Sequence, residues 1–481
     1  MDQKIFQEAF SLYNSTLTRA HILRAGIKLR DEIVPEILDN AVKKCMERYP
    51  YFCVELKKKD GKWILAENRK PVVVNNSENI VTLGSEEANG HMIAFSYNGN
   101  WINIGMSHAV TDGTGIYEVF RTLLYYYCSE RYDKHLSTEG IRLAGDTISD
   151  EEWEQPLPKL KDIKPKNPEK VAPALCLVDE SQLSISRHHR SWDITIDEEE
   201  FMKFVSENGG TPSTMTAVLL SRAIDSQHPQ SRTIDSVHSL SRAIDSVHSL
   251  SRAIDSQHSL SRAIDSQHPQ SRTIDSEHSL SRAIDSQHSL SRKPIKIFLA
   301  MNLRRALNVP LAHQTLVGGV ILEYKPELRD RSIKEQVAEY RSLVSVQTKR
   351  ENVIAIAAEQ KAMLEAILAQ PTDEARKTFA GKMAEMSDSS ITAGVSYVGK
   401  ANLGEAEKYV IDFRTYTNSI GKTPIVEISA VNGRFMINFI QPFEDDRYIK
   451  AFLGELESNH ISYSLLDEVE VKLPGLSLPW N

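Results

Sequence analysis

The first third of the chain alternates between two spacings of apolar residues, which predict strands and helices in turn. Stretches with a period of two read as strands, and stretches whose apolar residues recur every three or four positions read as helices. Turn-forming dipeptides, Asp60-Gly61 and Asn98-Gly99, predict two hairpins. The predicted elements are a strand at 20–29, a helix at 32–50, hairpins at 51–67 and 91–108, and a helix at 115–128.

The last part of the chain repeats this order of elements. Residues 423–443 alternate around Asn432-Gly433, which predicts another hairpin, and 445–459 carry their apolar residues on one helical face. The stretch that begins at Glu154 is rich in Pro and Lys, which is typical of a linker. The pattern therefore predicts two related α/β halves, with residues 1–153 in the first, a linker at 154–186, and residues 187–481 in the second.

A decapeptide repeat interrupts the second half. From 221 to 290 a unit such as SRAIDSQHSL occurs seven times. Ten residues fall about 80° short of three helical turns, so the Ile positions would drift around a helix and form no single buried stripe. We interpret 221–290 as a low-complexity insertion that contributes nothing to a core. The flanks favour this interpretation, because a helix at 211–225, which starts at Thr211-Pro212, and a strand at 293–303 would join through a short surface turn with all but one unit removed.

Each repeat unit places a His three residues after an Asp, a spacing that could bind a metal weakly. We favour a polar expansion by tandem duplication and expect no metal site. Over the whole chain, hydrophobic residues make up 41% and charged residues 25%, as in an ordinary globular protein. A net charge of −8 gives no reason to expect nucleic acid as a partner.

The four cysteines lie far apart, which predicts reduced thiols of a cytoplasmic protein. The first residues lack the apolar run of a signal peptide, and no stretch reaches transmembrane length. We therefore expect a soluble, cytoplasmic protein with no membrane span.

Two His-x-x-x-Asp motifs compete for a chemical role. His108 and Asp112 lie in GMSHAVTDGTG, where the predicted hairpin ends and a helix begins. Alternation places Ile104, Met106 and His108 on one face, and the glycines at 113 and 115 would permit a tight turn beneath the imidazole. His189 instead lies in an alternating, glycine-free stretch that reads as a strand. We favour His108, although a hydrogen-bonded structural histidine is the alternative.

The residues SHAVTDG after a strand resemble the His-x-x-x-Asp-Gly signature of the coenzyme A-dependent acyltransferase superfamily. This superfamily includes chloramphenicol acetyltransferase, alcohol acyltransferases and the condensation domains of peptide synthetases. Three further segments are similar to its motifs: CMERYPYF at the end of the first long helix, MNLRRAL at a strand end, and SYVGK at 396–400. The likeness covers nearly all of the chain except the repeats, and is closest to bacterial alcohol acetyltransferases and condensation-like proteins.

The resemblance implies two chloramphenicol-acetyltransferase-like α/β sandwich halves with an active-site channel between them. It implies that His108 is the catalytic base and that Asp112 is structural, paired with Arg304 rather than Arg305. Gly113 belongs to the same motif, and Ser396 is a candidate oxyanion contact. The co-substrate implied is acyl-CoA, with no permanently bound cofactor, and the acceptor is a small hydroxyl or amine compound.

The sequence also departs from the family pattern. Ser107 stands where many members have a first histidine, and the plant-type Asp-Phe-Gly-Trp-Gly motif is reduced to DFRTY at 412–416. Two alternatives stay open beside the CoA-dependent enzyme. One is condensation-type transfer from a carrier protein's thioester, and the other is a non-catalytic relative that uses the repeats for binding.

Overall fold

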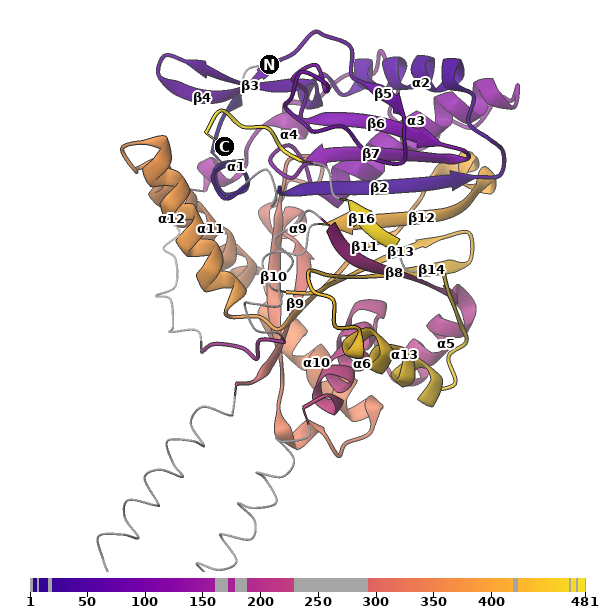
Figure 1. Ribbon diagram of the computed structural model, residues 1–481, viewed down its shortest axis with the longest axis vertical. Helices are drawn as coiled ribbons and strands as arrows, with labels where there is room; N and C mark the ends of the chain where they lie inside the picture. The colour runs from indigo at the N-terminus through magenta and orange to yellow at the C-terminus, as the bar shows by residue number, and fades with distance from the viewer. Residues whose placement is uncertain are drawn as a thin grey trace, which may run out of the picture.

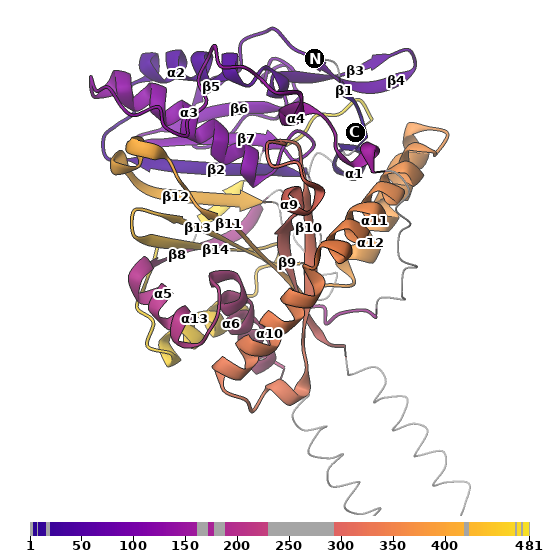
Figure 2. The same cartoon turned by 180° about the vertical axis from the view of Figure 1, so that it is seen from behind.

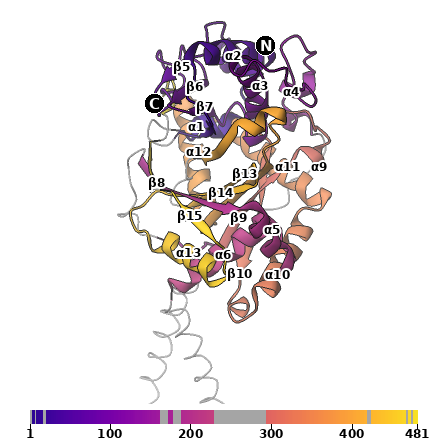
Figure 3. The same cartoon turned by 90° about the vertical axis from the view of Figure 1, so that its right-hand side faces the viewer.

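The computed structural model describes residues 3–6, 8–15, 20–160, 172–177, 188–228, 293–417, 423–466, 469–472 and 475–480. These residues form two α/β lobes stacked on each other (Figures 1 and 3). Most repeat units and much of the expected linker, 161–171 and 178–187, lie outside the described residues.

The N-lobe is built on a five-stranded sheet in the order β12-β2-β7-β6-β5. The sheet is covered on one face by the long helices α2 and α3 (Figure 1). Its strands are β2 (Ile22–Leu29), β5 (Val74–Asn76), β6 (Ile93–Asn98), β7 (Trp101–Ser107) and β12 (Val410–Thr417), and its helices are α2 (Pro35–Arg48) and α3 (Gly113–Arg131). A small sheet lies beside it, formed by β1 (Gln3–Lys4), β4 (Lys62–Glu67) and β3 (Val54–Lys59).

The C-lobe is built on a larger, mixed sheet in the order β10-β9-β11-β13-β14-β8-β15, with β16 also paired to β8. Four helices pack on it, seen most clearly from behind (Figure 2). Its strands are β8 (His188–Asp197), β9 (Ile295–Asn302), β10 (Val317–Tyr324), β11 (Ala393–Lys400), β13 (Ile425–Val431), β14 (Arg434–Gln441), β15 (Tyr463–Leu465) and β16 (Val469–Lys472). Its helices are α5 (Glu198–Glu207), α6 (Pro212–Ser226), α10 (Ile333–Gln347) and α13 (Arg447–Ser458).

The remaining helices connect the lobes. The hairpin of α11 (Arg350–Leu368) and α12 (Asp373–Asp388) packs against α1 (Glu8–Tyr13). The short elements are α4 (Asp150–Trp153), α9 (Arg304–Leu307), η1 (Pro50–Phe52), η2 (Leu157–Lys159), η5 (Pro326–Leu328) and η6 (Gly404–Tyr409).

The predicted hairpins form, but one turn is shifted by a residue. Asp60 and Gly61 both have positive φ, as a type I′ turn requires. In the β6–β7 hairpin Asn98 already pairs with Trp101, so the turn residues are Gly99 and Asn100 and not Asn98-Gly99. Gly99, at φ 56°, takes the first turn position, which in a type II′ turn favours glycine.

The sequence division at residue 153 is not a division in space. β12, from the second half of the chain, pairs with β2 along Thr417↔Leu23 to Val410↔Leu29. Phe413 of this strand is fully buried in the N-lobe core, where it meets Phe120 of α3. The second half of the chain therefore contributes a strand to the N-lobe sheet, where it covers the edge of β2 that would otherwise be open.

The expectation that the repeats add nothing to a core is wrong for the first unit. Helix α6 continues through Ser226 and therefore includes the first six residues of that unit, 221–226. Ile224 is fully buried, Ser221 hydrogen-bonds Tyr340 at 2.7 Å, and Asp225 pairs with Arg329 at 3.0 Å. Since these residues extend an existing amphipathic helix, their burial does not need the ten-residue period to match a helical one.

Candidate active site

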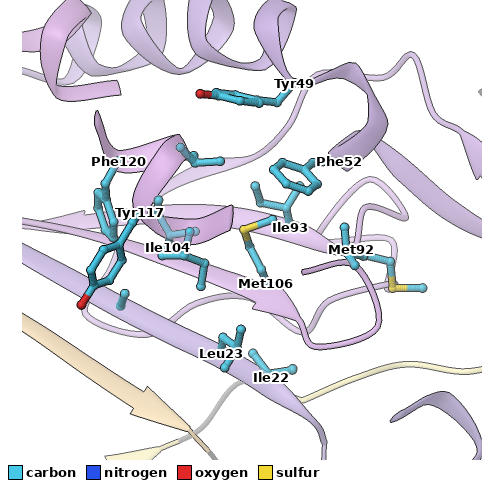
Figure 4. Close-up of a cluster of buried hydrophobic side chains, with 14 of the residues drawn as sticks. Ile22, Leu23, Tyr49, Phe52, Met92, Ile93, Ile104, Met106, Tyr117 and Phe120 are labelled. Atoms are coloured by element: carbon cyan, nitrogen blue, oxygen red, sulfur yellow. The ribbon is translucent and has the colours of Figure 1, made fainter. Parts of the chain in front are cut away.

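The loop at 108–112 connects β7 of the N-lobe to α3. Met106 and Ile104 of β7 lie in the buried cluster with Phe120 of α3, so both ends of the loop are anchored in one core (Figure 4). The strand ends at Ser107, whose carbonyl accepts a hydrogen bond from the Val110 amide at 2.9 Å. His108 therefore lies in a turn and not on the alternating face of β7. It is half-buried, whereas the apolar side chains of that face are buried completely.

Asp112 caps α3 and binds a cation from the other part of the chain. Its Oδ1 accepts from the Thr114 amide at 3.0 Å and from Arg304 Nη2 at 2.9 Å. Its Oδ2 lies 2.9 Å from Arg304 Nη1 and accepts from the Leu316 amide at 2.9 Å. Both side chains are buried, and a buried carboxylate needs such partners to remain charged. Arg305, the neighbouring arginine, is exposed.

Arg304 lies in the loop at 303–316, which connects β9 to β10 and which we term the α9 loop. Arg304 also donates to the carbonyls of Ala312 at 2.5 Å and Gln314 at 2.6 Å. The last residues of this loop run beside the His108 turn. There the Thr111 hydroxyl donates to the His313 carbonyl at 2.7 Å, and the Thr315 hydroxyl donates to the His108 carbonyl at 2.6 Å.

The two motif glycines act by their size and not by unusual backbone angles. Neither Gly113 nor Gly115 has positive φ, contrary to the role expected for them. A Cβ on Gly113 would lie 2.5 Å from Val398 Cγ2, and one on Gly115 would lie 1.9 Å from Thr111 Oγ1. The glycines thus let α3 approach β11 and let Thr111 fold over the first turn of the helix.

The environment of His108 favours a neutral imidazole. Burial lowers the pKa of His108, and the Asp112 charge and the carbonyls of His108 and Thr111 oppose that effect only in part. Nδ1 lies 3.4 Å from Thr315 Oγ1. A neutral imidazole can accept a proton near pH 7, which is what a general base requires.

Ser396 does not join His108 in the observed contacts. It pairs in register with Glu427 of β13, and its hydroxyl hydrogen-bonds that buried carboxyl together with Thr417. Desolvation raises the pKa of Glu427. The same strand reaches the motif two residues later, where Val398 contacts Gly113.

A buried polar network contacts the α9 loop at His313, and the sequence did not predict it. Arg48 donates to both carboxylate oxygens of Glu152 at 2.9 Å, Tyr51 donates to Glu152 Oε2 at 2.9 Å, and Tyr51 Oη lies 2.7 Å from His313 Nδ1. Burial and nearby arginines lower the pKa of His313 to about 3. Arg48 lies in the CMERYPYF segment, which was the available signal, but Glu152 and His313 stand in no recognisable motif.

Two cavities in the described structure lie away from His108. One, of about 700 Å³, is lined by residues of both lobes, including Lys28, Asp412, Arg414 and Arg434. The other, of about 210 Å³, lies by the C-terminal residues 477–479. Among the described residues no three His, Cys, Asp or Glu side chains gather as metal ligands, and no helix there is long and apolar enough to cross a membrane.

Comparison with known proteins gives a clear result only for the fold. No family model and no curated protein sequence matches the chain. Several solved structures superpose on most of it. TRI101 from F. graminearum, in complex with coenzyme A and T-2 mycotoxin, has a TM-score of 0.55 and 10% identity over 97% of this chain and 99% of its own.

Two other solved structures are similar over most of this chain. Polyketide synthase associated protein 5 from Mycobacterium tuberculosis has a TM-score of 0.52 and 12% identity, over 94% of this chain and 97% of its own. The nonribosomal peptide synthetase FmoA3 has a TM-score of 0.53 and 12% identity, over 96% of this chain and 42% of its own. The chain therefore has the two-lobed fold of the coenzyme A-dependent acyltransferases and condensation domains, as its sequence motifs predicted.

Proposed function

We propose that the protein is an acyltransferase that moves an acyl group from a CoA thioester to a hydroxyl or amine acceptor, with His108 as the general base. The observation that carries this proposal is the half-buried imidazole in a loop fixed by a buried ion pair. His108 retains some exposure, while Asp112 and Arg304 beneath it are inaccessible. A neutral imidazole in that position is accessible to a substrate and held against rotation.

The proposed step needs no covalent intermediate. The acceptor's hydroxyl or amine proton passes to His108 while its oxygen or nitrogen attacks the thioester carbonyl carbon. The C–S bond then breaks, and the imidazolium returns the proton to the departing thiolate. Positioned proton transfer of this kind contributes roughly 10²–10⁴-fold to a rate.

The oxyanion contact from Ser396 stays part of the proposal. Its hydroxyl bonds Glu427, whose pKa burial raises. When Glu427 is protonated it can donate to Ser396, which leaves the Ser396 proton available for a developing oxyanion.

The alternative donor is the phosphopantetheine thioester of a carrier protein, and the likeness to FmoA3 favours testing it. Both donors present the same thioester to His108, so the chemistry is shared. The two donors differ in the group that the protein would bind outside the site. A direct competition between the two donors therefore shows which of them the protein prefers.

The test is thiol release from acyl-CoAs of increasing chain length and from an acylated carrier protein, each with alcohol and amine acceptors. We expect release from the intact chain and from a variant lacking residues 231–290, because the folded part of the first repeat unit is retained. His108→Ala should reduce release roughly 10²–10⁴-fold, whereas His135→Ala, at an exposed position after α3, should not.

Release that survives in His108→Ala would reject the assigned base. No release from any donor with the intact chain would support the non-catalytic alternative. Loss of release on deletion of the repeats alone would give those repeats an essential role.

A further inference from the structure

Thr315 lies in the α9 loop between a residue that contacts Arg304 and a residue that contacts Asp112. The residue before it, Gln314, accepts from Arg304 through its carbonyl at 2.6 Å. The residue after it, Leu316, donates its amide to Asp112 at 2.9 Å. The backbone of Thr315 is therefore fixed on both sides by the ion pair that also holds the His108 turn.

The hydroxyl proton of Thr315 has a defined partner. Thr315 Oγ1 donates to the His108 carbonyl at 2.6 Å. A threonine hydroxyl carries one proton, so toward any other neighbour it can only accept. That other neighbour is Nδ1 of the same histidine, 3.4 Å away.

This arrangement selects one form of the neutral ring. Since Thr315 can only accept from Nδ1, this contact favours the imidazole proton on Nδ1 and the lone pair on Nε2. Thr315 is the side-chain partner of the ring, and the carbonyls of His108 and Thr111 are its backbone partners. His108 and Thr315 are both half-buried, while Asp112, Arg304 and His313 are buried. His108 and Thr315 are therefore the partly exposed members of this group of hydrogen-bonded side chains, and the other members are buried.

We propose that Thr315 is a positioning residue that fixes the tautomer and orientation of His108, so that Nε2 is the atom that accepts the acceptor's proton. The inference rests on the proposed acyl transfer for its kinetic part. The orientation of the base then depends on both parts of the chain, because His108 lies in the N-lobe and Thr315 lies in the loop between two C-lobe strands.

The experiment compares Thr315→Val, which keeps the side chain's shape and removes the hydroxyl, with Thr315→Ser, which keeps the hydroxyl. We expect Thr315→Val to lower kcat by about tenfold or more with little change in the KM for acyl-CoA. Thr315→Ser should remain close to the original enzyme. Thr216→Val, at a fully buried threonine in α6 far from the site, controls for the substitution itself.

A second readout does not depend on activity. Imidazole ¹⁵N spectra of histidine-labelled protein, with the His108 signal identified by its loss in His108→Ala, report which nitrogen carries the proton. We expect Nδ1–H in the original protein and in Thr315→Ser, and a shift toward Nε2–H in Thr315→Val.

The inference is overturned if the original protein carries the proton on Nε2, or if Thr315→Val changes neither tautomer nor kcat. If the intact chain releases no thiol from any donor, the proposed function fails, but the spectra still decide the role of Thr315. Thermal unfolding of each variant separates these results from a loss of fold.

Discussion

The chain contains the same succession of hairpin, loop and helix twice, and the two loops differ in what holds them. In the N-lobe, β6 and β7 lead through 108–112 into α3. In the C-lobe, β13 and β14 lead through 442–446 into α13. In the second loop, Gln441 of β14 donates to the carbonyls of Phe443 and Asp445 at 2.7 Å, and Arg190 of β8 donates to the carbonyl of Glu444, a residue whose side chain is 87% exposed.

The first loop is held by a buried ion pair to the α9 loop. Its Asp112 binds Arg304, which lies 192 residues later in the chain. The order of elements is the same, but only the first of these two loops is held to a distant segment by a buried ion pair. The shared element order therefore provides a rigid frame, and the proposed catalytic residue lies in the loop that this buried pair holds in place.

The two aspartates at the helix starts give the largest expected contrast. Asp112→Ala should cost about 3–5 kcal/mol of unfolding free energy, because it leaves Arg304 buried and unpaired. Asp446 begins α13 and pairs with Lys450, which is 71% exposed, so Asp446→Ala should cost less than about 1 kcal/mol. Chemical denaturation measures both values.

The double variant Asp112→Ala/Arg304→Ala sharpens that contrast. It should be less destabilised than the sum of the single variants, since neither charge is then left alone. Equal costs for Asp112→Ala and Asp446→Ala would contradict the view that the first loop is clamped from outside.

Replacing a glycine by alanine should lower the free energy of unfolding in α3 and raise it in α13. Gly113→Ala places a Cβ 2.5 Å from Val398 Cγ2 and should destabilise by about 1–3 kcal/mol. Adding Val398→Ala should recover most of that loss. Gly454→Ala in α13 meets nothing within 4 Å and should stabilise by about 0.5–1 kcal/mol. A destabilised Gly454→Ala, or no recovery in the double variant, would break this comparison.

The clamped loop should also make the activity depend on pH. Burial lowers the pKa of His108, so kcat/KM should rise with pH through an apparent pKa below the ordinary 6.5 and be flat above it. A pH–rate profile checks this expectation. An apparent pKa above 6.5 would mean that the protonated ring is favoured and that the site is organised differently.

The free energy of unfolding should also rise with pH, because of His313. Its folded-state pKa is lowered to about 3, so its contribution is complete above 6.5 and is lost as pH falls toward 3. The loss is at most about 1.4 kcal/mol per pH unit for one proton. His313→Gln, measured at several pH values in that range, should show a shallower slope than the original protein.

The sequence predicted the features that depend on neighbours in the chain. The hairpins, α2, α3 and α13 follow from local periodicity, and the His108 motif stands at the strand-to-helix change that periodicity marks. Asp112 stood in the same motif, but its pairing with Arg304 came from a family resemblance, because that contact depends on the fold as a whole.

The missed features depend on contacts between distant residues. β12 joins the N-lobe sheet by pairing with β2, which no periodicity reveals. Thr315 and His313 stand in an unremarkable stretch, AHQTL, and gain their positions only because Arg304 and Asp112 hold the α9 loop in place. The burial of the first repeat unit was missed because the whole of 221–290 was interpreted as an insertion, although the predicted helix at 211–225 already included part of that unit.

The most direct test of the central claim is a crystal structure of the protein with coenzyme A. The account predicts the thiol sulfur beside His108 Nε2, with the Asp112–Arg304 pair unchanged beneath the ring. Coenzyme A bound in the 700 Å³ cavity beside Lys28 and Arg434, with nothing in contact with His108, would contradict it.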